Sequence, residues 1–296
     1  MNLRKPFLVL SALSVMALGC GTEGEETVDD NNANKVDTSQ TSTNVVINGK
    51  IFSIPSPIQT AILIKKTGAS YNKEILNSSK KLNGYSSNFQ KALNLGIYGA
   101  DLGYVSLFEQ SQDAVEYMQA VKKLGDELGV SGAFDPNLIT RFKNNISNKD
   151  SLLVLVSSAY RASDAYLKEN KRNNVSGLIL VGGWIESLHF SINTNNQKPN
   201  EEIKRRIAEQ KLSLTNVIEL LSEYEKEAEY KKLLDSLKDL ATVFEKIEFK
   251  YVFEQPTTDA ENKITTVNSK TEVVFTAEQM DAISKKISAI RASIVG

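Results

Sequence analysis

The stretch VSGLILVGGWIESLHFSIN, residues 175–193, is one of the two most apolar helices that the sequence predicts, the other being residues 150–169. It has little polar face, and a helix that is apolar nearly all round belongs in the interior of a fold. The apolar run that starts at Gly177 is too short to cross a membrane, which takes about 20 residues. The sequence therefore predicts a helical domain packed around a buried central helix.

Other segments repeat apolar residues at helical spacing, so the expected fold class is all-α, a bundle of about eight to nine helices. Capping boxes at Ser56–Gln59 and Thr276–Gln279, and the pair Asp135-Pro136, mark three helix starts. The further expected helices cover residues 57–77, 87–110, 112–128, 135–145, 200–224, 225–251 and 277–294.

Two of these helices, 200–224 and 225–251, have seams of apolar residues at alternating spacings of three and four. Tyr251 is the last member of the second seam. Such seams pack as in a coiled coil, so an antiparallel pair within the domain is expected. The alternative is a docking surface for a helix of a partner protein.

Small β-hairpins are expected near both ends of the domain. Asn48-Gly49 is a strong two-residue turn signal between the apolar runs 45–47 and 50–52. Residues 264–267 and 271–275 alternate in polarity, and we expect a second hairpin around Asn268-Ser269.

Glycines stand inside two of the expected helices. Gly182 and Gly183 lie in the central helix, and Gly96, Gly99 and Gly103 follow each other at intervals of three and four. Each costs roughly 1 kcal/mol relative to alanine within a helix. We expect the two helices to cross with their backbones near each other. The alternative is a ligand in a glycine-lined groove.

Around these glycines lie the residues of a candidate ligand groove, which include the only Trp and the only His of the chain. They are Asp101, Tyr98, Trp184, Glu186 and His189. Asp101 shares a helical face with Asn94 and Tyr98. An aspartate in an apolar segment is expensive to bury unless it is bonded, so it should cap a helix, pair with Arg161 or bind a polar ligand.

Glu186 and His189 have the E-x-x-H spacing of ferritin-like di-iron bundles, which need two such pairs. One histidine cannot complete that pattern, so no metal site is expected. The preferred interpretation is a partly buried His189 bonded to Glu186 or to a backbone group. No nucleophile elbow and no phosphate-binding loop is present in the sequence. We therefore name no catalytic residue and expect no cofactor.

The first 19 residues follow the three-part plan of an export signal, with Arg4 and Lys5 as the basic start and an apolar stretch over residues 7–18. Cys20, the only cysteine of the chain, comes directly after them. Ala17-Leu18-Gly19-Cys20 resembles the lipobox of bacterial lipoproteins, with Ala17 and Leu18 in exchanged positions. This resemblance covers about twenty residues. It implies that residues 1–19 are a signal peptide, that Cys20 carries the lipid, and that the protein is held at the outer membrane, on its periplasmic face or at the cell surface.

Residues 20–44 are acidic and polar with almost nothing apolar, so a disordered tether is expected between the lipidated Cys20 and a single helical domain over 45–296. The chain has 35 basic and 36 acidic residues, and loss of Arg4 and Lys5 with the signal leaves 33 against 36. Basic and acidic residues are interleaved, which argues against a nucleic-acid partner.

The sequence thus predicts a lipid-anchored protein of the cell envelope that serves as a binding or structural module. Its expected partners are the membrane, through Cys20, and an envelope protein or a small ligand. An enzyme is the less favoured hypothesis. The alternative function is an envelope enzyme or metal-binding protein that uses Glu186, His189 and Asp101.

Overall fold

The computed structural model describes residues 43–47, 50–133, 137–146 and 148–296. The chain divides into two units, 1–35 and 36–296, and all that follows concerns the second unit.

Several of the sequence predictions fall outside the described residues. They are the signal peptide 1–19, the lipid attachment at Cys20, the tether except for its last two residues, the Asn48-Gly49 turn and the Asp135-Pro136 cap. These stay predictions.

The described residues form nine α-helices and a few short antiparallel strand pairs, which confirms the predicted all-α fold class. The helices are α1 (Pro57–Lys66), α2 (Asn88–Leu107), α3 (Ser111–Glu127), α4 (Leu138–Asn144), α5 (Lys149–Glu169), α6 (Asn173–Gln197), α7 (Glu201–Ser222), α8 (Ala228–Phe244) and α9 (Ala277–Val295). Short 3₁₀ helices cover Lys73–Ile75, Ser79–Gly84 and Ser131–Ala133.

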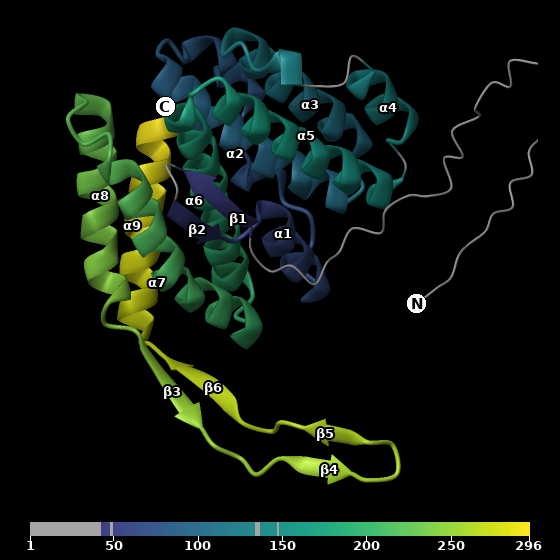
Figure 1. Ribbon diagram of the computed structural model, residues 1–296, viewed down its shortest axis with the longest axis vertical. Helices are drawn as coiled ribbons and strands as arrows, with labels where there is room; N and C mark the ends of the chain where they lie inside the picture. The colour runs from purple at the N-terminus through teal and green to yellow at the C-terminus, as the bar shows by residue number, and fades with distance from the viewer. Residues whose placement is uncertain (1–42, 48–49, 134–136, 147) are drawn as a thin grey trace, which may run out of the picture. The chain divides into compact units, whose positions relative to one another are not determined.

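Helix α6 is the central helix that the sequence predicts. It packs against α1, α2, α5, α7 and α9, and Figure 1 shows these helices gathered around it. Among the described helices it is the one long and apolar enough to span a membrane, but 89% of that apolar window is buried inside the protein. Its apolar surface is therefore covered by the neighbouring helices.

The predicted close crossing of two glycine-bearing helices is confirmed. A Cβ added to Gly96 of α2 would lie 2.0 Å from the carbonyl oxygen of Ile179, and one added to Gly182 of α6 would lie 2.0 Å from the carbonyl oxygen of Leu93. Only glycine permits backbones to approach this closely. The crossing fixes which faces of α2 and α6 oppose each other.

The other glycines of α2 make room for side chains and not for the α6 backbone. A Cβ on Gly99 would lie 2.0 Å from the Tyr160 hydroxyl of α5, and one on Gly103 would lie 3.3 Å from Ile58 of α1. The glycines of α2 therefore accommodate three different neighbouring helices.

The predicted seams of α7 and α8 pack within the domain. Ile207, Leu214 and Leu221 of α7 and Leu237 and Leu240 of α8 are all buried. Helix α7 packs on α6 and α8, and α9 completes the group against α8 and α6. The interpretation as an intramolecular pair is confirmed.

Helix α1 is shorter than the sequence predicts. It ends at Lys66 and not near residue 77, because Gly68 adopts a left-handed φ of 74° that stops the helix. Its first residue is a proline, as predicted, but the Ser56 side chain makes no cap hydrogen bond, so the capping box predicted there is wrong. The predicted box at Thr276 and Gln279 is present.

Helix α8 also ends early, at Phe244, and Tyr251 leaves the predicted seam with 67% of its surface exposed. Residues 248–251 alternate charged and aromatic side chains, a pattern of period two that favours a strand over a helix. They belong to strand β3 (Glu248–Val252).

The strands form three two-stranded sheets. They are β1 (Thr43–Ile47) with β2 (Lys50–Ile54), β3 with β6 (Lys270–Val274), and β4 (Thr257–Asp259) with β5 (Ile264–Thr266). The first pair confirms the predicted hairpin and begins at Thr43, two residues earlier than expected.

The second predicted hairpin has its strands in place, but its pairing is wrong. Residues 264–266 pair with 257–259, and 270–274 pair with 248–252. Together the four strands make a long two-stranded arm between α8 and α9 (Figure 1). Asn268 and Ser269 lie along the arm and bond to Gln255 and Glu254 across it, so they do not form a turn at its tip.

Candidate functional site

A buried polar cluster and a pocket between helices are the two candidate sites among the described residues. The first is a buried polar cluster of Asp101, Glu186, His189 and Arg291, where α2, α6 and α9 meet. The second is an apolar pocket between α2, α3, α4, α5 and α6. The cluster contains three of the five residues that the sequence marks as a candidate groove.

Glu186 is the centre of the polar cluster. Its side chain is fully buried in α6, and both carboxylate oxygens accept from Arg291 of α9, at 2.5 Å from Nε and 2.6 Å from Nη2. The same Nη2 donates to the Ile75 carbonyl at 3.1 Å. A two-pronged guanidinium contact of this kind is the strongest geometry for a carboxylate pair.

Asp101 lies beside Glu186 as a result of the α2–α6 crossing. It is fully buried and accepts one hydrogen bond, from the Asn77 backbone N–H at 3.3 Å. Burial, followed by the neighbouring Glu186 carboxylate, raises the pKa of Asp101 well above its ordinary value. The raised pKa favours the protonated form of Asp101, because a second carboxylate charge beside Glu186 is costly in a buried site.

His189 also belongs to the cluster, one turn along α6 from Glu186. Its Nε2 lies 3.2 Å from the Ile75 carbonyl oxygen, so Nε2 carries the proton. Burial lowers the pKa of His189, although the charge of Glu186 opposes this. The predicted bond of His189 to a backbone group is confirmed, with a neutral imidazole as the hydrogen-bond donor.

The remaining two residues of the candidate groove make their hydrogen bonds to groups outside this cluster. The Tyr98 hydroxyl donates to the Ser78 carbonyl at 2.8 Å, and burial raises the pKa of Tyr98. Trp184 is buried on another side of α6, where its Nε1 donates to Gln210 of α7 at 2.9 Å.

The predicted pairing of Asp101 with Arg161 is wrong. Asp101 accepts from the Asn77 backbone N–H, and the Arg161 guanidinium donates to the Ser158 hydroxyl of its own helix at 3.2 Å. The crossing of α2 with α6 turns Asp101 toward Glu186 and Arg291, and the Coulomb effect of both residues on the pKa of Asp101 reflects this position.

Arg291 is the member of the cluster that the sequence reasoning missed. It stands 105 residues from Glu186, so no local spacing connects them. A weaker signal exists in α9, where Ile287, Ile290 and Ile294 mark the buried face and Arg291 falls on its edge. Within the described part of the chain, no group of three or more His, Cys, Asp and Glu side chains is placed to hold a metal ion.

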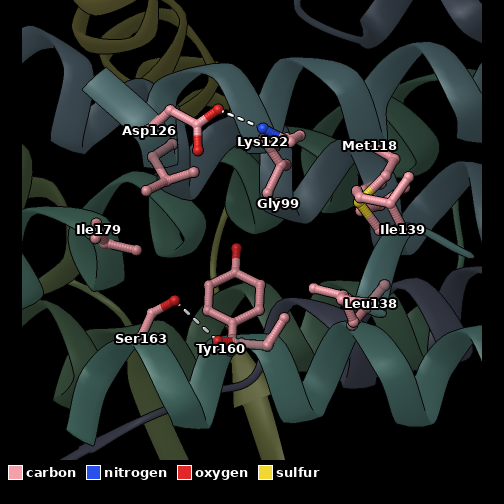
Figure 2. A pocket seen from close by; sticks show the side chains of 14 residues that line it. Gly99, Met118, Lys122, Asp126, Leu138, Ile139, Tyr160, Ser163 and Ile179 are labelled. Carbon is pink, nitrogen blue, oxygen red and sulfur yellow. Dashed lines mark hydrogen bonds and ion pairs between the residues drawn. The ribbon is translucent and has the colours of Figure 1, made fainter. Parts of the chain in front are cut away.

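The second place is a cavity of about 230 Å³ that is lined by 14 residues (Figure 2). Nine of the lining residues have aliphatic or methionine side chains, one is Gly99, and four are polar: Lys122, Asp126, Tyr160 and Ser163. Hydrophobic walls with a few placed polar groups are typical of small-molecule sites.

Gly99 and Tyr160 shape one side of this cavity. The Tyr160 ring extends from α5 into the cavity (Figure 2), and its hydroxyl donates to the Gly96 carbonyl of α2 at 3.0 Å. Because a Cβ on Gly99 would lie 2.0 Å from that hydroxyl, this position of the ring requires a glycine. Burial raises the pKa of Tyr160, so its hydroxyl stays protonated.

Lys122 and Asp126 stand at the mouth of the cavity, on successive turns of α3. Their charged atoms are 2.5 Å apart, and the side chains are 53% and 43% exposed. Sequence reasoning missed this pocket, since its walls come from five helices and no local pattern reveals how those helices pair. Comparison of the chain with protein-family models, with curated proteins and with solved structures finds no match.

Proposed function

We propose that the protein is a lipid-anchored binding module of the bacterial cell envelope, and that it binds a small apolar molecule in the cavity between α2, α3, α4, α5 and α6. The observation that carries the binding role is the cavity itself, about 230 Å³ bounded mainly by aliphatic side chains. Each Å³ of residual cavity in a protein core costs about 24 cal/mol. A fold that keeps such a space forgoes stability, and ligand binding offsets that loss.

The lipid anchor rests on separate support. The first twenty residues resemble a lipoprotein signal that ends at Cys20, and an envelope position at the outer membrane follows from that resemblance. Radioactive palmitate should label the protein, and the label should vanish in Cys20→Ser. Incorporation that survives Cys20→Ser would refute the anchor.

Benzene tests the binding role, because it makes no hydrogen bonds and requires only an apolar cavity. A dry engineered cavity of about 150 Å³ binds benzene, so benzene should enter this larger one. With ¹³C-methyl methionine, benzene should shift the methyl resonance of Met118, which lines the cavity, and leave that of Met280 on α9 unchanged. Equal or absent shifts at the two methionines would refute the site.

A metal-binding or enzymatic role for Asp101, Glu186 and His189 is the second candidate. What favours it is the placement of three titratable groups in one buried cluster. What weighs against it is that Arg291 already occupies both oxygens of Glu186, and that Ile75 holds His189. Stoichiometric metal in purified wild-type protein, lost in His189→Ala, would favour this role over the binding module.

A further inference from the structure

The hydroxyl groups inside the cavity have their protons committed elsewhere. Tyr160 donates its hydroxyl proton to the Gly96 carbonyl at 3.0 Å, and Ser163 donates its own to the Ala159 carbonyl at 2.9 Å. A hydroxyl has one proton and two acceptor lone pairs. Toward the cavity, Tyr160 and Ser163 therefore present acceptors only.

This arrangement selects among polar ligands. A ligand that donates a hydrogen bond satisfies such a lone pair, whereas a carbonyl, ether or carboxylate oxygen faces another acceptor. An unmatched polar group in an apolar site loses the hydrogen bonds that it made in water. The interior thus favours a ligand with a hydroxyl or N–H group.

The mouth of the cavity selects for neutral ligands. Lys122 and Asp126 bring opposite charges within 2.5 Å of each other, and they are the charged residues among the 14 that line the cavity. An anionic ligand would be attracted by Lys122 but repelled by Asp126, and a cationic ligand would meet the reverse. Neither sign of charge gains a net advantage at this mouth.

The volume limits the size of the ligand. A cavity of about 150 Å³ accommodates the six carbons of benzene, so 230 Å³ accommodates roughly nine non-hydrogen atoms on the same scale. The walls are aliphatic side chains and Met118, which adapt to flexible chains as well as to rings.

We infer that the pocket binds an uncharged aliphatic alcohol of medium chain length, with its hydroxyl donating to Tyr160 or Ser163 and its chain among the aliphatic walls. This ligand class rests on the proposed binding function and makes it specific. 1-Octanol, with eight carbons and one oxygen, has the expected size and polarity.

The test compares four probes by titration calorimetry on the full chain carrying Cys20→Ser, in buffer free of detergent. They are 1-octanol, heptyl methyl ether, octanoate and octylammonium. The ether has the same number of non-hydrogen atoms as 1-octanol but only accepts hydrogen bonds. We expect 1-octanol to bind about fivefold more tightly than the ether, since one hydrogen bond contributes about 1 kcal/mol, and more tightly than either charged probe.

Variants of one helix locate the binding and its polar contact. Ala159→Phe fills the cavity and should abolish binding, whereas Ala165→Phe, on the exposed face of α5, should not. The double change Tyr160→Phe with Ser163→Ala should reduce the roughly fivefold preference for 1-octanol to less than about twofold. Should Ala159→Phe fail to fold, the shift of Met118 against Met280 on addition of 1-octanol to the Cys20→Ser chain locates the site without a cavity variant.

The outcomes separate the ligand class from the function on which it rests. Benzene binding together with equal affinity for 1-octanol and the ether, or with tighter binding of a charged probe, overturns the ligand class and keeps the binding module. Failure of benzene and of all four probes overturns both.

Discussion

Arg291 and Glu186 form a buried ion pair that joins the last helix of the chain to its central helix. Both carboxylate oxygens of Glu186 are bonded to the guanidinium, and the Glu186 side chain has no exposed surface. The pair ties α9 to α6 at the point where Asp101 of α2 also arrives. Three helices distant in sequence thus meet at this pair.

Replacement of Arg291 by methionine should destabilise the protein strongly. Met keeps much of the apolar stem but leaves Glu186 as a buried charge without a partner, and breaking such a pair costs about 3–5 kcal/mol. Urea unfolding followed by circular dichroism measures the loss. The matched double variant, Arg291→Met with Glu186→Gln, should recover part of it because the buried charge is gone. If the unfolding free energy of Arg291→Met alone were within about 1 kcal/mol of wild type, the stabilising role of the pair would be contradicted.

Asp101→Asn should change how stability depends on pH. The pKa of Asp101 is raised in the folded protein, mainly by burial and then by Glu186. Above pH 3.8, its ordinary pKa, the unfolded chain releases this proton while the folded chain keeps it. The contribution of Asp101 to stability is thus fully present below pH 3.8 and is lost as pH rises through the folded pKa, by at most about 1.4 kcal/mol per pH unit.

The asparagine of this variant has no proton to lose, so the difference in unfolding free energy between Asp101→Asn and wild type should grow in favour of the variant as pH rises. Urea denaturation at about pH 5, 6.5 and 8 measures this difference. His189 acts with the opposite sign: burial lowers its pKa, so its contribution is lost as pH falls below 6.5. Because both proteins keep His189, its effect cancels in the difference. A difference that is constant with pH would show that Asp101 is ionised in the fold.

The helices of this protein were largely predictable because their signals are local. The apolar character of 175–193 predicts the buried α6, and the seams of 200–224 and 225–251 predict the α7–α8 pair. The prediction failed where the helical spacing and the strand spacing overlap. Tyr251 continues the helical spacing of Phe244 and Ile247, but it also belongs to a segment in which charged and aromatic residues alternate, as in a strand. Residues 248–252 form a strand because they pair with β6, which lies about 20 residues later in the sequence.

The candidate site was predicted in part. Glycines at helical spacing mark the faces on which two helices cross, and this spacing can be seen in the sequence. The crossing brings Asp101 near Glu186. Arg291 and the walls of the cavity come from helices that are in contact only through tertiary packing. The spacing of residues within one helix does not show which other helix it will contact. Trp184 shows the same limit, since its position in the helix does not reveal that Gln210 is its partner.

Gly182→Ala should be severely destabilising, and Gly177→Ala in the same helix should not. The added methyl group of the first would lie 2.0 Å from the Leu93 carbonyl oxygen, which requires the α2–α6 backbones to separate. That of the second would lie 3.5 Å from Leu220, an ordinary contact. We expect a loss of at least about 3 kcal/mol for Gly182→Ala and a gain of up to about 1 kcal/mol for Gly177→Ala. Thermal and urea unfolding of both variants measure these changes. Equal changes in unfolding free energy for the two variants would contradict the close crossing.

The arm made by β3 to β6 should be dispensable for folding of the helices. Its side chains are mostly exposed, with Tyr251 at 67% and Phe253 at 65%, so they bury little apolar surface in the fold. The arm is held at its base by Ile247 and Phe275, which are buried. Replacing residues 251–271 by Asn-Gly joins the paired Lys250 and Glu272 through a two-residue turn.

We expect this shortened protein to keep its unfolding free energy within about 1 kcal/mol of wild type, because residues on an exposed surface contribute little to stability. Phe275→Ala provides the comparison, since it removes a buried side chain and should cost about 3 kcal/mol or more. Urea unfolding of the two variants distinguishes an exposed arm from a structural one. If shortening the arm costs as much as Phe275→Ala, the arm supports the helices; if it costs little, its exposed aromatic residues contribute nothing to the stability of the domain.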